Sequence, residues 1–500
     1  MPPAVRADDA ASLLAKHRAF VGWQYGDGAV QSLVLEQTYT DESGRVTQHV
    51  TEQRIGLAYR RDYQSTKDYE SDYSTGFTGN IFWTTSANGF TVPLIGDRAK
   101  YYLAYDVLFN EGTSELPATL KGTATVDGKT VDILHITMNG ALPYDVYEDP
   151  DTGAFVQAVL DPGGEYDFTI KIASYADIGL GKKHIGVWSY GNSKGQYAYT
   201  KITLNPAVSA TDLHPPAPSA TWTFANSQPF PIRVTAQRIY LDAKVNGVPG
   251  RFILDTGASG IFLFDAFADK AKVKDEQISR AHGIGGSTKA YIRKADSVEI
   301  GGNTLKNVIV TSFDDKHRFQ DALNNEQPDG LIGFDVFGGA IVDLSLSTGT
   351  MRITDPAAGP AAAPSGAYPV TVDLSTLQPR VPVKLDDKLA VLALLDTGGS
   401  SLVLISDQVE HHGINLLANR DSGFLGGNSA VGGIGDSYDV TVCGPMARVS
   451  LGPIVYTGTE ACESSAWDLH SALLGFDFLK HFDYVFDYPH GVLYMKPHNG

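Results

Sequence analysis

Cysteine is scarce in this chain of 500 residues, since Cys443 and Cys462 are the only two. No Cys-x-x-Cys pair and no cluster of His and Cys at zinc spacing is present, which argues against a structural metal site. We therefore expect neither a metal nor another cofactor. The two cysteines either form one disulfide within the last domain or remain two buried thiols, and the sequence leaves both alternatives open.

Long apolar runs are also missing, and the longest ones are far shorter than a membrane-spanning helix requires. Basic residues are few, because 39 Lys and Arg stand against 57 Asp and Glu, for a formal net charge of −18. Such a chain repels nucleic acid and anionic membrane surfaces, so neither is an expected partner. Residues 1–7 contain no apolar segment of a signal peptide, so the protein is cytosolic or its signal peptide is absent from this sequence.

Glycine, tyrosine and phenylalanine are plentiful, at 52, 24 and 22 residues. This composition favours strands joined by tight turns, and we expect a mainly β protein. The length exceeds what one core supports and predicts three domains. Residues 205–219 and 355–367 are rich in Pro and Ala and read as linkers. The predicted domains are therefore 1–215, 221–355 and 367–500.

The first of these domains begins with a predicted short helix over residues 8–20, with Asp8 or Asp9 near its N-cap. A series of short strands follows, separated by turns such as Asn88-Gly89 and Asp127-Gly128. The clearest strand candidates are residues 29–39, 54–59, 130–138 and 154–161. This pattern predicts a large antiparallel sheet, curved or partly closed.

The two segments after the linkers repeat one another. An apolar run leads into Asp255-Thr256-Gly257 in the first segment and into Asp396-Thr397-Gly398 in the second. Three further landmarks recur in the same order. These are the glycine-rich stretches at 283–286 and 433–436, the triplets Leu331-Ile332-Gly333 and Leu473-Leu474-Gly475, and the final strands 340–346 and 484–487. The Asp-Thr-Gly motifs and the triplets keep nearly the same offset between the two segments, so the segments are expected to fold alike.

An apolar strand that ends in Asp-Thr-Gly presents a carboxylate at the edge of a buried sheet, and the glycine permits a sharp turn. Two such loops, related by a pseudo-two-fold axis, bring two carboxylates together. Carboxylates about 3 Å apart cannot both ionise comfortably, so they share one proton. The ionised member activates a water, and the protonated member donates to the carbonyl oxygen of a peptide.

These motifs resemble the two lobes of aspartic proteases, over more than half of the chain. The resemblance implies a bilobal aspartic protease fold, with Asp255 and Asp396 as the catalytic pair. Thr256 and Thr397 would hydrogen-bond between the lobes, while Gly257 and Gly398 would allow the turns. The glycine-rich stretches resemble retropepsin flaps more than pepsin flaps, which places Ile284, Gly285, Ile434 and Gly435 at flap tips. Because both lobes lie in one chain, we expect a monomer.

The sequence departs from the pepsin pattern at one position in each lobe. Ala258 and Gly399 stand where pepsin-like enzymes often have a hydroxyl residue that supports the ionised carboxylate. We therefore expect an activity optimum in weak acid. The leading interpretation is an aspartic endopeptidase that acts on peptides or proteins. The alternative is a catalytically impaired module that keeps the protease fold and binds peptides or proteins.

The predicted N-terminal domain resembles LolA-like lipoprotein-carrier domains in its opening helix, strand pattern and Asp-Gly turns. This resemblance implies a bacterial envelope protein, periplasmic or secreted, whose signal peptide is not in this sequence. It also implies that the domain could bind an apolar ligand, hold a substrate or occlude the cleft.

Three other patterns receive structural interpretations. Polar residues precede a third Asp-Thr-Gly at Asp151, so it is expected to be a turn between strands. Residues 191–195 match the Gly-x-Ser-x-Gly pattern of serine hydrolases, but the flanking strands are polar, which favours a hairpin turn. His411-His412 follows a predicted helix over 406–410, where a helix C-terminus alone favours histidine.

Overall fold

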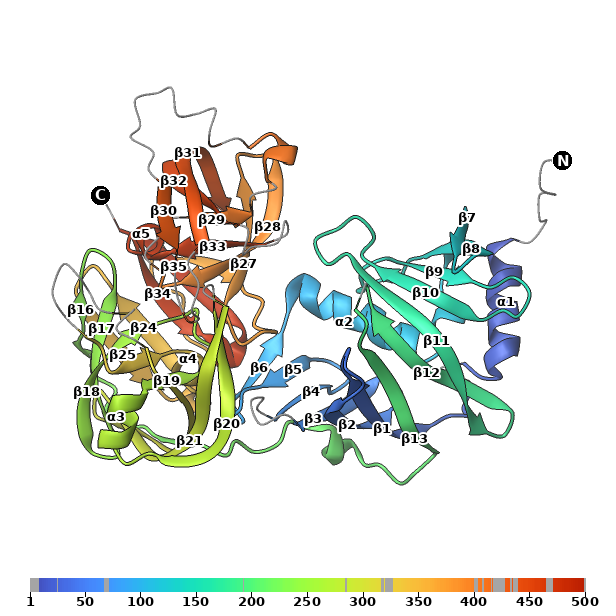
Figure 1. Cartoon of the computed structure of the whole chain (residues 1–500), viewed down its shortest axis with the longest axis horizontal. Helices are drawn as coiled ribbons and strands as arrows, with labels where there is room; N and C mark the ends of the chain where they lie inside the picture. The colour runs from blue at the N-terminus through green and yellow to red at the C-terminus, as the bar shows by residue number, and fades with distance from the viewer. Residues whose placement is uncertain are drawn as a thin grey trace. The chain divides into compact units, whose positions relative to one another are not determined.

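The computed structural model describes residues 9–24, 26–66, 72–191, 193–283, 286–315, 319, 327–399, 403–406, 409–414, 416, 428–431, 434, 439–464 and 471–498. With those gaps, the chain divides into two units (Figure 1). The first unit comprises residues 9–66, 72–83 and 95–215, and the second comprises residues 84–94 and 216–498. The predicted mainly β class is confirmed. In the part of the chain described, no helix is both long and apolar enough to cross a membrane.

The first unit opens with helix α1 (Ala10–Val21), close to the predicted bounds. Asp9 caps its N-terminus by accepting a 2.8 Å hydrogen bond from the Ser12 amide. Gly22 ends the helix in the left-handed conformation, at φ 77°, which glycine adopts without steric cost. The helix buries Leu13, Leu14 and Val21, which places it on the hydrophobic core of this unit.

An extended sheet forms most of the first unit, and its described strands pair antiparallel, as predicted. The strands lie in the order β5-β4-β3-β2-β1-β13-β12-β11-β10-β9-β8-β7. Their bounds are β1 Ser32–Thr40, β2 Val46–Ile55, β3 Ala58–Ser65, β4 Tyr73–Phe77, β5 Phe82–Thr85, β7 Ala118–Val126, β8 Lys129–Ile136, β9 Tyr144–Glu148, β10 Phe155–Leu160, β11 Phe168–Gly179, β12 Lys182–Tyr190 and β13 Gln196–Leu204.

Two expectations for this unit were wrong or incomplete. Residues 54–59 are not one strand, because the turn at Gly56-Leu57 separates the end of β2 from the start of β3. Helix α2 (Gly96–Phe109) was not predicted at all. No side chain caps its N-terminus, and its run of aromatic residues has strand propensity, so packing against the sheet decides its conformation.

The linker at 205–219 contains a short 3-10 helix, η2 (Ala210–Leu213), whose Leu213 is buried. The composition of this stretch predicted that none of its residues would be part of a core. This prediction was wrong for Leu213. The boundary between the two units falls directly after it, at Pro215-Pro216.

The second unit contains two sheets of matching topology. The first has the order β14-β22-β19-β23-β18-β17-β21-β20, and the second has the order β27-β28-β33-β29-β32-β31-β30. We call these sheets lobe 1 and lobe 2. Lobe 1 comprises β14 Thr221–Thr223, β16 Arg233–Val234, β17 Ile239–Val245, β18 Val248–Leu254, β19 Ile261–Phe264, α3 Asp265–Lys270, β20 Lys274–Gly283, β21 Gly286–Ile300, β22 Asn303–Phe313, β23 Gly330–Ile332 and α4 Phe334–Gly339. Lobe 2 comprises β27 Arg380–Leu385, β28 Leu389–Asp396, β29 Val403–Ser406, η4 Val409–His412, β30 Asn428–Val431, β31 Asp439–Leu451, β32 Ile454–Ser464, β33 Ser471–Gly475 and α5 Phe476–Leu479.

The central strand pairings of the two lobes correspond, and lobe 1 adds β14 beside β22 and β16 beside β17. In lobe 1, β23 lies parallel to β18 and antiparallel to β19, which lies parallel to β22. In lobe 2, β33 lies parallel to β28 and antiparallel to β29, which lies parallel to β32. The sequence repeat is therefore a repeat of structure.

A third sheet joins strands from both halves of the repeat, in the order β15-β25-β24-β34-β35-β26. The two predicted final strands pair directly within it, with Val342 of β24 opposite Phe486 of β34. Its strands are β15 Phe230–Pro231, β24 Ile341–Ser345, β25 Thr350–Thr354, β26 Tyr368–Thr371, β34 Phe482–Asp487 and β35 Val492–Pro497. One continuous cluster of buried side chains runs through both lobes and this sheet.

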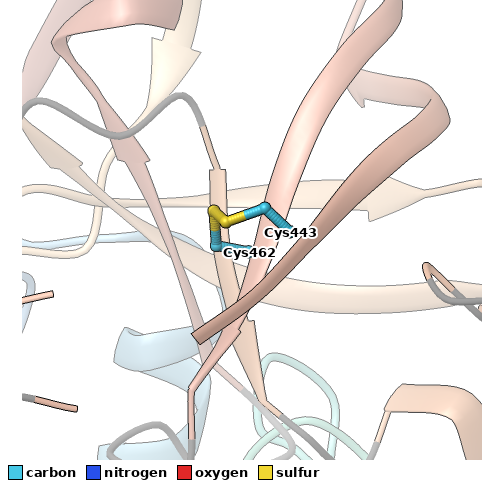
Figure 2. The surroundings of a disulfide bond; sticks show 2 residues. All are labelled: Cys443 and Cys462. Atoms are coloured by element: carbon cyan, nitrogen blue, oxygen red, sulfur yellow. A yellow bond between two sulfur atoms is a disulfide. The ribbon is translucent and has the colours of Figure 1, made fainter. Parts of the chain in front are cut away.

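The two cysteines form a disulfide, which decides between the alternatives left open by the sequence (Figure 2). Cys443 of β31 and Cys462 of β32 lie directly opposite one another across the antiparallel pair. The bond packs against Leu394 of β28 and Leu473 of β33. The disulfide therefore ties the β31–β32 hairpin at the point where it covers the strand leading to Asp396.

Candidate active site

Two buried strands deliver the two predicted catalytic aspartates. β18 ends at Leu254, directly before Asp255, and β28 runs through Leu395 to Asp396. The side chains of Leu254 and Leu395 are almost fully buried, as hydrophobic strands covered on both faces require. Burial of the strands fixes where each carboxyl emerges.

Thr256 and Thr397 join the two loops by four buried hydrogen bonds. The Thr256 amide donates to Thr397 Oγ1 at 3.0 Å, and the Thr397 amide donates to Thr256 Oγ1 at 3.0 Å. Each hydroxyl then donates across the interface, Thr256 to the Leu395 carbonyl at 2.6 Å and Thr397 to the Leu254 carbonyl at 2.7 Å. The loops are thereby held in a symmetric pair.

Gly257 and Gly398 allow the loops to approach this closely. A Cβ on Gly257 would lie 2.7 Å from Asp396 Cγ, and one on Gly398 would lie 2.4 Å from Asp255 Cγ. Neither distance can accommodate a methyl group, because both are far below van der Waals contact. Each glycine therefore makes room for the carboxyl of the opposite lobe.

The carboxyls of Asp255 and Asp396 are hydrogen-bonded to each other. Asp255 Oδ1 accepts from the Gly257 amide at 2.8 Å, and Asp396 Oδ1 accepts from the Gly398 and Gly399 amides at 2.8 and 3.0 Å. Burial, followed by the charge of Asp396 and the shared hydrogen bond, raises the pKa of Asp255 well above its ordinary value. Burial also raises the pKa of Asp396, but the hydrogen bond from Asp255 and the two amides oppose this rise, so the arrangement favours the shared proton on Asp255.

The residue after Gly333, and the residue after its lobe 2 counterpart Gly475, each donate a backbone hydrogen bond to the aspartate loop of the same lobe. The Phe334 amide donates to the Ala258 carbonyl at 2.9 Å, and the Phe476 amide donates to the Gly399 carbonyl at 2.7 Å. A Cβ on Gly333 would lie 2.3 Å from the Ala258 carbonyl oxygen, so a side chain there would push the loop away. This contact explains why the lobe 1 triplet ends in glycine.

The predicted flap tips lie mostly outside the described residues, which do not include Ile284, Gly285 and Gly435. Ile434 is described, and its backbone and Cβ lie within about van der Waals reach of Gly283 at the end of β20. Its side chain packs against a buried cluster of lobe 1 that includes Tyr240, Ile253 and Leu331. The lobe 2 flap candidate therefore contacts lobe 1.

Sequence reasoning missed several residues that support the loops. Gln378, just before β27, donates a hydrogen bond from its side chain to the Gly257 carbonyl of lobe 1. Arg238 donates from its guanidinium to the Phe319 carbonyl at 2.6 Å, and its charge partly offsets the burial that raises the pKa of Asp396. Asp335 is buried beside the lobe 1 loop. Of these residues, only Asp335 could have been identified from the sequence, because it follows the Gly-Phe pair that recurs in both segments.

Burial raises the pKa of Asp335 to about 6, against hydrogen bonds from Ser86, Asn88 and Ile261 that lower it. Because this folded-state pKa exceeds the ordinary value of 3.8, the folded protein binds more protons than the unfolded chain between these pH values. The contribution of Asp335 to stability is therefore greatest below pH 3.8 and is lost as the pH rises towards 6.

Asp335→Asn should remove this pH dependence. The free energy of unfolding of the variant, relative to the wild type, should rise by about 3 kcal/mol between pH 3 and pH 7. Urea unfolding of both proteins across this range measures the difference. A difference that stays constant with pH would contradict the assigned shift.

The other motifs behave as predicted, with one exception. Asp151-Thr152-Gly153 lies in the turn between β9 and β10, and the described residues of the Gly-x-Ser-x-Gly pattern, 191 and 193–195, lie between β12 and β13. The predicted helix at 406–410 was wrong, because Ser406 ends strand β29 and the helical turn is η4, which itself includes both histidines. Over the residues described, no group of three or more His, Cys, Asp and Glu side chains is arranged to hold a metal ion.

Comparison with known proteins supports part of this assignment. A family model described as aspartyl protease matches residues 241–336, which include Asp255 and Asp335. This region is therefore aspartyl protease-like. No curated protein matches the chain.

A solved structure similar to this chain is that of a DUF1329 family protein from Desulfovibrio piger. It is 13% identical, with 41% of this chain and 95% of that chain covered, at a TM-score of 0.30. A likeness of this size supports no argument about the fold. The resemblance of residues 1–215 to LolA-like domains stays a prediction.

Proposed function

We propose that the protein is an aspartic endopeptidase in which Asp255 and Asp396 form the catalytic pair. The observation that carries the proposal is the hydrogen-bonded pair of carboxyls, held by reciprocal threonine hydrogen bonds between the lobes. A protease-like region matched by a family model supports the reaction class. Catalysis by such a pair requires no cofactor.

Each carboxyl has a distinct role in the reaction. Ionised Asp396 takes a proton from a water as the water oxygen attacks the peptide carbonyl carbon, and protonated Asp255 donates its proton to the carbonyl oxygen. The tetrahedral intermediate then loses its C–N bond as the amine nitrogen accepts a proton from Asp396 and one hydroxyl of the intermediate returns a proton to Asp255, which restores the starting protonation state. The amide hydrogen bonds to Asp396 favour its ionised form at the start of the cycle.

The Gly399 amide bears on the alternative of an impaired peptide-binding module. Its hydrogen bond to Asp396 supplies a donor where a hydroxyl side chain is lacking. The main reason for suspecting an inactive second lobe is thereby weakened. Ala258 and Gly399 still leave the pair without hydroxyl donors at these positions, so we propose an optimum in weak acid.

A mixed peptide library tests the proposal, with and without the transition-state mimic pepstatin, from about pH 3 to pH 8. We expect cleavage that pepstatin blocks, with a maximum above about pH 3. Tight peptide binding without cleavage at any pH would favour the binding module instead. A rate maximum below about pH 3 would reject the weak-acid expectation alone.

We further propose that the enzyme acts as a monomer in a bacterial periplasm or in secreted form. The disulfide supports an oxidising compartment, because such bonds persist outside the reducing cytosol. The predicted N-terminal domain would serve as an accessory module that holds substrate or an apolar ligand. Size-exclusion chromatography with light scattering, and fractionation of the producing cell, test the two parts of this proposal separately.

A further inference from the structure

Residues 84–94 belong to the second unit although their neighbours in sequence belong to the first. Phe90 and Val92 are part of the buried cluster that runs through both lobes. Ser86 and Asn88 are also buried, at 2% and 0% exposure, which is unusual for polar side chains without specific partners. This segment, which we call the inserted turn, ends in strand β6 (Thr91–Leu94).

Asn88 fixes the inserted turn to lobe 1 through the backbone of Ile309 in β22. Its Nδ2 donates to the Ile309 carbonyl at 2.9 Å, and its Oδ1 accepts from the Ile309 amide at 2.7 Å. The Ser86 amide donates to the Phe90 carbonyl at 2.9 Å, which closes the turn. The hydroxyl of Ser86 is therefore held in a defined position against lobe 1.

From that position, Ser86 Oγ donates a 3.0 Å hydrogen bond to Oδ1 of Asp335. The same carboxyl accepts hydrogen bonds from the Asn88 side chain and from the Ile261 amide. Ile261 is the first residue of β19, directly after the loop that carries Asp255. The other oxygen, Asp335 Oδ2, faces Gly260, where an added Cβ would lie 3.1 Å away. Asp335 therefore holds the end of the Asp255 loop.

Lobe 2 lacks this arrangement at the corresponding place. Asp477, which follows Gly475 and Phe476 as Asp335 follows Gly333 and Phe334, has a side chain that is 44% exposed. Its carboxyl pairs with Lys480 at 2.6 Å. The inserted turn thus acts on one loop of the pair, the one that carries the protonated aspartate.

We propose that Ser86 and Asn88 are positioning residues for catalysis, acting through Asp335 on the loop of Asp255. The chain of contacts runs from Ser86 Oγ to the Asp335 carboxyl, to the Ile261 amide, and along the loop to Asp255. The inference rests on the proposed function, because it assigns these residues to the protease reaction. On this inference, the inserted turn contributes to the function of the second unit as well as to its fold.

Ser86→Ala tests the inference, with Ser347→Ala as the matched control. Ser347 also donates its hydroxyl to a carboxylate, Asp483 Oδ2 at 2.7 Å, but it lies on the surface beside the third sheet. We expect Ser86→Ala to lower kcat by about tenfold with little change in KM, because a displaced loop disturbs the reacting geometry more than peptide binding. Ser347→Ala should leave both constants unchanged. Ser86→Thr, which keeps a hydroxyl, should recover most of the lost kcat.

Hydrogen exchange at the Ile261 amide gives a readout that does not depend on activity. Exchange should accelerate by about tenfold in Ser86→Ala and stay unchanged in Ser347→Ala, because only the first variant weakens the acceptor of that amide. Wild-type kcat in Ser86→Ala, or equal losses in both variants, would overturn the inference and leave the proposed function standing. A wild-type protein that cleaves no peptide would instead reject the proposed function, whatever the exchange result.

Discussion

Asp255→Asn and Asp396→Asn are each expected to lower kcat/KM by about 10⁴-fold, because each removes one partner of the proton transfer. An asparagine at 396 cannot take a proton from water, and one at 255 cannot give a proton to the carbonyl oxygen. The side chains keep their shape, so the fold should persist. Burial disfavours the charged form of Asp255, and asparagine carries no charge. The melting temperature of the Asp255→Asn variant should therefore not fall below that of the wild type.

The chain supplies its own control for this experiment in Asp151→Asn. Asp151 begins the third Asp-Thr-Gly, which lies in the turn between β9 and β10. We expect this variant to cleave the same peptides at the wild-type rate. Activity retained in both Asp255→Asn and Asp396→Asn, with thermal unfolding unchanged, would reject the catalytic assignment.

Thr397→Ala is expected to destabilise the protein by about 3 kcal/mol, since buried partners are left without their hydrogen bonds. The variant removes the acceptor for the Thr256 amide and the donor to the Leu254 carbonyl. Both partners lie between the lobes, where the side chain of Thr397 is 1% exposed. Activity should fall as well, because these hydrogen bonds set the spacing of the two carboxyls.

Thr397→Ser is the matched control, because serine keeps the hydroxyl and removes only a methyl group. Urea unfolding of the two variants should therefore separate the loss of the hydrogen bonds from the loss of packing. Thr256→Ala combined with Thr397→Ala should remove all four hydrogen bonds between the loops, because each hydroxyl makes a different two of them. Equal destabilisation by Ser and Ala at position 397 would show that the hydroxyl is unimportant.

Local sequence patterns were sufficient for the features that depend on a repeat or on a turn. The apolar runs before Asp255 and Asp396 predicted buried strands, since only a strand covered on both faces is continuously apolar. The missing apolar strand before Asp151 correctly predicted a turn. Helix α1 followed from its N-cap at Asp9, which is a signal confined to a few residues.

Features that depend on residues far apart in the sequence could not be predicted from local patterns. Helix α2 has aromatic residues with strand propensity and no side-chain N-cap, so its conformation is set by packing. The pairing of Cys443 with Cys462 required the β31–β32 register, which places them opposite one another. The turn at Asn88-Gly89 was predicted, but nothing local showed that it belongs with residues 216–498.

The sequence by itself determined the duplicated lobes and the identity of the two candidate carboxyls, because both are encoded in contiguous motifs repeated in the same order. Only the tertiary structure decided that Ser86 reaches Asp335, 249 residues away, and that Gly399 supports Asp396 through its backbone. The physical reason is that a hydrogen bond depends on positions in space, and a motif records only neighbours along the chain. The strands fix the carboxyls locally, while the contacts that tune them come from elsewhere in the second unit.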